Sequence, residues 1–157
     1  MRWKTLRFGK HDGESIPEIL LHDPDWFFWA WSRGVFNESS NYFDEAVVAH
    51  AKATSIRIPQ TRTERLDVEY TFHPDGTCLG FDLVPSNRPR HQGSTRTARS
   101  DHIDLSVPHR AASYDKLGNR QFLRSVKSCL FGDPAAHMTR QSCEAFFNDD
   151  SNFDRNS

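Results

Sequence analysis

Residues 66–84 read LDVEYTFHPDGTCLGFDLV, and this stretch decides the kind of fold that we expect. Apolar and polar side chains alternate through LDVEYTF and through CLGFDLV, as they do in strands that bury one face. The HPDGT between them is a turn sequence, because Pro74 presets the first turn angle and Gly76 can adopt a left-handed backbone. The pattern predicts an antiparallel hairpin over residues 65–84.

Further strands and helices are expected on both sides of this hairpin. HIDLSV (102–107) also alternates, with Ile103 and Leu105 facing one way, and predicts a third strand of the same sheet. WKTLRF (3–8) predicts a short strand near the N-terminus. Helical spacing and cap residues predict helices over residues 15–22, 24–33, 41–53, 113–131 and 134–147. We therefore expect an α+β fold in which a small antiparallel sheet packs against N- and C-terminal helices.

The chain of 157 residues fits one domain. We expect this domain to cover residues 1–147, followed by a flexible polar tail over 148–157. Within this domain we expect a tight turn with helices over residues 8–34, the sheet over residues 65–107 and the last helices over residues 113–147.

The N-terminal helices carry clear start and stop signals. Ser15 and Glu18 have the spacing of a capping box, Asp23 and Pro24 are a good N-cap and first helical residue, and Gly34 is a typical stop.

The second of these helices contains five aromatic rings within residues 26–31. Because it is apolar nearly all round, we expect it to be buried. The alternative is that an exposed ring, Trp26 or Trp31, binds a partner.

Residues 8–29 follow an ordered pattern without a gap, made by Phe8, Gly9, Lys10, Gly13, Ile16, Glu18, Ile19, Asp23, Pro24 and Trp29. On these residues the segment resembles the small module found at the C-terminal end of exodeoxyribonuclease X-like proteins and in some bacterial proteins described as quorum-sensing-regulated virulence factors. His11 stands where that module usually has an aromatic residue, and Trp26 replaces a tyrosine. The resemblance implies a nucleic-acid-associated accessory piece, a tight turn packed on helices, with no catalytic residue to transfer.

Composition excludes several classes of protein. A formal net charge of -1 excludes a polycationic coat protein but leaves room for a local basic patch. The basic N-terminus lacks the apolar stretch of a signal peptide, and no window approaches a membrane span, so we expect a cytoplasmic protein. The three cysteines are widely spaced and indicate buried, reduced thiols rather than disulfides or a zinc site.

The basic feature of the sequence is PSNRPRHQGSTRTARS (85–100), which we expect to be a long loop. Arginine forks and neighbouring hydroxyl groups are suited to phosphate oxygens, and Gly93 would let the backbone approach a ligand closely. The alternative is a solvated loop paired with the protein's own acids. We expect the phosphate-binding residues to be Arg88, Arg90, Arg96 and Arg99, with a contribution from Lys10.

Catalytic patterns are weak. Asp67 and Glu69 imitate the Asp-x-Glu metal motif of exonucleases, but too few residues separate them from the His109–Asp115 segment that would complete such a site. Histidines are plentiful, yet pairs such as His102 and Asp104 are typical of polar strand faces, so we expect no metal and no cofactor. No serine lies in a nucleophile-elbow sequence.

The sequence thus favours a non-enzymatic bacterial or phage accessory protein that contacts nucleic acid, DNA rather than RNA, or a nucleic-acid-processing enzyme. The first alternative is a protein-interaction module, an inhibitor or adaptor that uses its aromatic or acidic surfaces. The second is a cryptic metal-dependent nuclease. Neither a membrane nor a small-molecule ligand is indicated.

Overall fold

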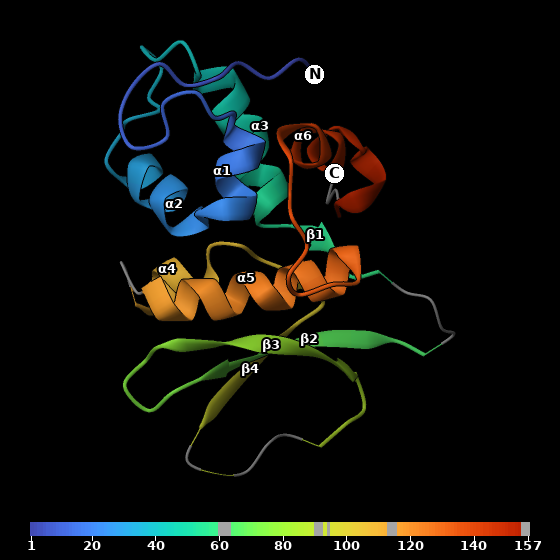
Figure 1. Cartoon of the computed structure of the whole chain (residues 1–157). Helices are drawn as coiled ribbons and strands as arrows, with labels where there is room; N and C mark the ends of the chain where they lie inside the picture. The colour runs from blue at the N-terminus through green and yellow to red at the C-terminus, as the bar shows by residue number, and fades with distance from the viewer. Residues whose placement is uncertain (60–63, 90–92, 94, 113–115, 155–157) are drawn as a thin grey trace.

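The computed structural model describes residues 1–59, 64–89, 93, 95–112 and 116–154. It has the expected α+β fold, with helices and two small antiparallel sheets. Figure 1 shows α4 and α5 lying between the three-stranded sheet and the other helices. In chain order the elements are α1 (Ile16–His22), α2 (Pro24–Ser32), α3 (Phe43–Ala53), β1 (Ile56–Arg57), β2 (Leu66–Phe72), β3 (Cys78–Pro85), β4 (Arg96–Ser100), β5 (His102–Ile103), α4 (Val107–Ala111), α5 (Lys116–Phe131), α6 (Arg140–Asn148) and the 3-10 helix η1 (Asp150–Asn152).

The predicted hairpin is confirmed as β2 and β3, in a register that places Tyr70 opposite Phe81. The third strand of its sheet was predicted wrongly. It is β4, which pairs with β2, whereas His102–Ile103 pairs with Ile56–Arg57 in a separate two-stranded sheet. The chain leaves the larger sheet after Ser100 because the apolar side chain of Ile103 packs in the core, where it is fully buried, and not on that sheet.

The helix α5 covers the inner face of the hairpin. Its Phe122 ring lies 5.5 Å from Phe81 and 6.3 Å from Tyr70, centroid to centroid. The helix comes so close that a Cβ on Gly80 would lie 2.7 Å from Ser125 Oγ, and Gly80 has a φ of +114° that side chains rarely adopt. Glycine is therefore required at this position for two separate reasons.

The N-terminal stop and start signals are confirmed. The Ser15 amide donates to the Glu18 carboxylate at 3.0 Å, Asp23 accepts a bond from the Trp26 amide, and Gly34 follows α2 with a φ of +75°.

The strand expected over residues 3–8 does not form, and this segment makes a single isolated bridge between Thr5 and Ser15. Two of its backbone amides donate to side chains at α3 instead of to a neighbouring strand: the Lys4 amide donates to Glu45 and the Arg7 amide to the Tyr42 hydroxyl.

The C-terminal region departs from expectation in two ways. No helix starts at Pro134; α6 begins at Arg140, where the Thr139 hydroxyl caps it by accepting from the Ser142 amide. Residues 148–154 are not a flexible tail, because Phe153 is 2% exposed and the Asp154 amide donates to the Ser55 carbonyl.

Candidate nucleic-acid interface

The arginine-rich segment is not a loop throughout, and its last five residues form β4. This places Arg99 in a structural role. Its Nε donates to Glu69 Oε2 at 2.8 Å, while its two terminal nitrogens donate to the carbonyls of Arg88 and Pro89 at 2.6 and 3.0 Å. Arg99 therefore ties the incoming segment to the sheet, and Glu69 compensates its charge.

Arg96 has a different environment. It lies opposite Phe72 in the sheet, as Ala98 lies opposite Tyr70. Because side chains alternate along a strand, Arg96 and Ala98 share the face that carries both rings. Arg96 is exposed, and its guanidinium pairs with no carboxylate among the described residues.

Beside this face lies a cleft of about 590 Å³ between β4 and α4, which we call the arginine cleft. The half-buried ring of Phe72 and the buried Tyr70 belong to its floor, and Arg110 on α4 belongs to its wall. No acidic residue of the described chain lines the cleft. Its described lining consists of Tyr70, Phe72, Gly76, Arg96, Thr97, Ala98, Arg99, Ser100, Val107, Arg110 and Ala111.

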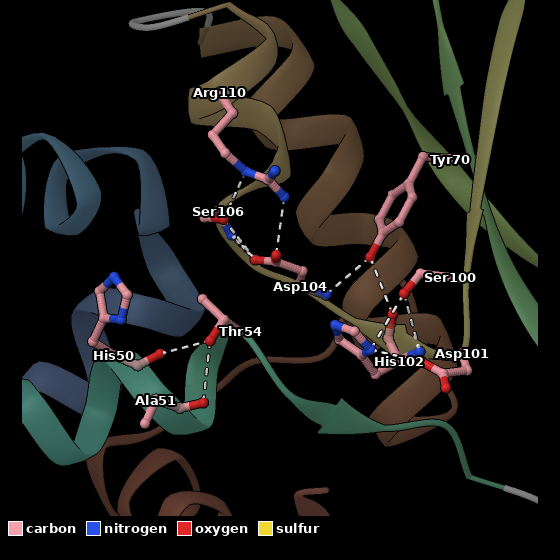
Figure 2. A network of polar contacts seen from close by, with 10 residues as sticks. All are labelled: His50, Ala51, Thr54, Tyr70, Ser100, Asp101, His102, Asp104, Ser106 and Arg110. Atoms are coloured by element: carbon pink, nitrogen blue, oxygen red, sulfur yellow. Dashed lines mark hydrogen bonds and ion pairs between the residues drawn. The ribbon is translucent and has the colours of Figure 1, made fainter. Parts of the chain in front are cut away.

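A polar network next to the cleft links Tyr70 of its floor to Arg110 of its wall through Asp104 (Figure 2). The Tyr70 hydroxyl accepts from the Asp104 amide at 2.9 Å and donates to the His102 carbonyl at 3.3 Å. Burial raises the pKa of Tyr70, so the phenol keeps its proton and remains a donor. This phenol thereby joins the sheet to the segment that leads into α4.

The same network holds Arg110. Its Nη2 donates to Asp104 Oδ2 at 2.9 Å and its Nε to Ser106 Oγ at 3.1 Å. Asp104 in turn accepts from the Ser106 amide and hydroxyl, which fixes the carboxylate. The Arg110 side chain is nevertheless 64% exposed, so it is oriented at the cleft while still accessible to a ligand.

The structure does not bring all the predicted phosphate-binding residues together. Arg96 lines the cleft, Arg99 also borders it but is engaged by Glu69, and Arg88 is exposed on the segment that Arg99 holds. Arg90 lies outside the described residues. Lys10 is at the N-terminal turn, 3.0 Å from Asp23, and lines a different groove.

The tryptophans proposed for partner binding are half-buried and packed against the core. Trp26 contacts the ring of His11 at 4.9 Å, and Trp31 stacks on His50 at 4.2 Å. Burial also lowers the pKa of His50, which favours its neutral form within this aromatic cluster.

The nuclease motif is not assembled among the described residues. Glu69 is paired with Arg99, and His109 lies 2.5 Å from Asp25 of α2. Asp115 lies outside the described residues. Among the described residues, one group of side chains could hold a metal, Glu14, Glu18 and His22, and it includes no residue of the nuclease motif.

Ser100, Asp101 and His102 have the composition of a hydrolytic triad but not its geometry (Figure 2). The serine hydroxyl and the aspartate both approach His102 Nδ1, at 3.3 and 2.8 Å. In a working triad the two groups bind opposite ring nitrogens, so that the histidine can pass a proton between them.

None of the three cysteines forms a disulfide. Burial raises the pKa of Cys129 to about 11 and that of Cys143 to about 12, which keeps these two thiols protonated at neutral pH.

Sequence reasoning missed two sets of cationic residues. The sequence does not predict that Arg110 belongs to the site, because Arg110 and Arg96 line the same cleft only once α4 has packed beside β4. Arg120, Arg124 and Lys127 do have a sequence signal, because their spacing of four and three residues places them on one face of α5.

No family model, curated protein or solved structure matches the chain. The resemblance of residues 8–29 to the exodeoxyribonuclease X-like module therefore stays a prediction. Within the described residues, none of the helices has the length and apolar character needed to cross a membrane.

Proposed function

We propose that this protein is a non-enzymatic accessory protein that contacts nucleic acid and holds an unpaired strand in the arginine cleft. The observation that carries the proposal is the arginine cleft itself, in which Arg96 and Arg110 flank an aromatic floor and no described lining residue is acidic. Arginine forks bind phosphate oxygens, and aromatic rings stack on bases of any sequence.

Shape favours an unpaired strand over a duplex. The volume of about 590 Å³ is that of a pocket for a small molecule, which typically measures about 300–1,000 Å³. A nucleotide from a single strand can enter such a cleft and place its base on Phe72, whereas bases in a duplex already stack on one another. The hydroxyl of Ser100, which shares the face of Arg96 and Ala98, adds a hydrogen-bonding group for phosphate or sugar.

The test is the salt dependence of binding to a single-stranded oligonucleotide, measured by fluorescence anisotropy with DNA and with RNA. Arg96→Ala should weaken binding and make the slope of log K against log salt shallower by about 0.7, the value for one phosphate on a single strand. Phe72→Leu should weaken binding by about 1–3 kcal/mol while leaving the slope unchanged, because it removes a stacking surface and no charge.

Arg33→Ala is the matched control, because it removes an exposed arginine at the end of α2 that does not line the cleft. The proposal is rejected if the unaltered protein does not bind, or if Arg96→Ala and Phe72→Leu both bind as Arg33→Ala does. Circular dichroism of each variant separates lost binding from lost folding.

A protein partner is the second candidate, and the position of β4 favours it. Among the described strands β4 pairs with β2 alone, and a strand from a partner would add at its other edge. Such a complex would depend on backbone hydrogen bonds and would survive salt concentrations that abolish phosphate contacts. Co-purification of one protein at high salt after nuclease treatment would support this candidate.

A further inference from the structure

A second basic surface lies on α5, away from the residues that line the arginine cleft. Arg120, Arg124 and Lys127 follow one another at helical spacing and therefore project from one face. Arg120 and Arg124 are exposed, and Lys127 is half-buried. These three side chains pair with no carboxylate in the part of the chain that the structure describes.

The N-terminal turn faces this surface and adds a fourth cation. Lys10, Asp23 and the three α5 side chains line one groove of about 470 Å³, which we call the α5 groove. Asp23 is the acid in its described lining, and it is already engaged by Lys10 Nζ and by His11 Nε2, each at 3.0 Å. Four cations against one engaged carboxylate leave the groove positively charged.

We propose that the α5 groove binds the phosphodiester backbone of nucleic acid without contacting the bases. Its described lining contains no phenylalanine, tyrosine or tryptophan on which a base could stack. With a rise of about 1.5 Å per residue, the seven steps from Arg120 to Lys127 span about 10 Å, which corresponds to about three base-pair steps of about 3.4 Å along the axis of a duplex.

This inference shares with the proposed function the premise that the ligand is nucleic acid, but it differs in the strand form that can bind. The arginine cleft requires an unpaired base for its aromatic floor. The α5 groove contacts phosphates alone, and these are present in duplexes and single strands alike. Binding to a duplex therefore reports on the groove, and the extra affinity for a single strand reports on the cleft.

The experiment is a salt titration of duplex DNA binding by the full chain. The double variant Arg120→Ala, Arg124→Ala removes two exposed charges and should make the slope of log K against log salt shallower by about 1.8, at about 0.9 per phosphate on B-DNA. The control variant Arg2→Ala, Arg33→Ala removes two exposed arginines that line neither site and should leave the slope unchanged. Arg120→Gln, Arg124→Gln repeats the test with polar side chains.

Each outcome decides the matter. An unchanged duplex slope in both α5 variants overturns the inference, whatever Arg96→Ala does to single-strand binding. A changed duplex slope, together with Arg96→Ala and Phe72→Leu variants that both bind single strands normally, supports the groove and rejects the cleft. Equal or tighter binding of polyglutamate, lost in the same α5 variants, would show that the groove takes acidic peptides and would overturn the assignment to phosphates.

Discussion

Arg99 and Arg96 stand three residues apart in one strand, and the structure predicts opposite consequences when each is removed. Arg99→Ala deletes an ion pair with Glu69 in which the two side chains are 18% and 14% exposed, together with two hydrogen bonds to backbone carbonyls. A hydrogen bond to a charged group contributes about 1.5–3 kcal/mol, and the residual exposure reduces this through screening. We expect Arg99→Ala to lower the free energy of unfolding by about 2–3 kcal/mol, partly because Glu69 is left unpaired.

Thermal and urea unfolding measure this effect. For a chain of this size, about 2–3 kcal/mol corresponds to a fall in Tm of roughly 4–12 °C. Arg96→Ala removes an exposed side chain that pairs with no carboxylate among the described residues, and should change the free energy of unfolding by less than about 0.5 kcal/mol. In a double-mutant cycle with Glu69→Gln, Arg99→Ala should show a coupling energy of about 0.5–3 kcal/mol. An unchanged Tm for Arg99→Ala, with a loss of binding equal to that of Arg96→Ala, would refute the structural role of Arg99.

Two further predictions concern stability. Phe153→Ala should lower the free energy of unfolding in urea by about 3–5 kcal/mol, because the ring is buried. The control Leu117→Ala, at a residue that is 62% exposed, should lower it by less than about 0.5 kcal/mol. Equal losses would mean that the C-terminal segment around Phe153 is not packed. Burial opposes the charged form of His11, but hydrogen bonds to Asp23 and Glu14 outweigh it and raise the pKa above 6.5. The stability that His11 contributes should therefore be complete below about pH 6.5 and be lost as the pH rises through the folded pKa. The free energies of unfolding in urea of the wild type and of His11→Gln should converge at high pH. Parallel profiles across this pH range would contradict the assignment.

The sequence predicts elements whose signals are local. The hairpin was found because two runs of period two flank a turn with Pro74 and Gly76, and α2 was found because Asp23, Pro24 and Gly34 mark its ends. β4 was missed because RTARS contains no apolar periodicity and owes its strand form to pairing with β2. Phe153 was missed because it stands alone in a polar segment, and its burial depends on Phe146, Phe147 and the other apolar residues around it.

The candidate site could be predicted only in part for the same reason. Arg96 was identified by residue type, since arginines among hydroxyl residues suit phosphate. Arg99 was assigned the same role because its partner Glu69 lies 30 positions away, and no local pattern shows that distance closing. Arg110 depends on the placement of α4 relative to β4, which tertiary packing alone determines.

The pairing of β1 with β5 has a topological consequence. Residues 56–57 pair with 102–103, so the two ends of the segment between them are held together. The three strands described in this segment are β2, β3 and β4. Closing a loop whose ends are already held costs only about 0.6 kcal/mol more for each doubling of its length. The loops between these strands can therefore gain or lose residues at little cost, provided that Tyr70 keeps its bond to the Asp104 amide and that Tyr70 and Phe81 keep their contacts with Phe122 of α5.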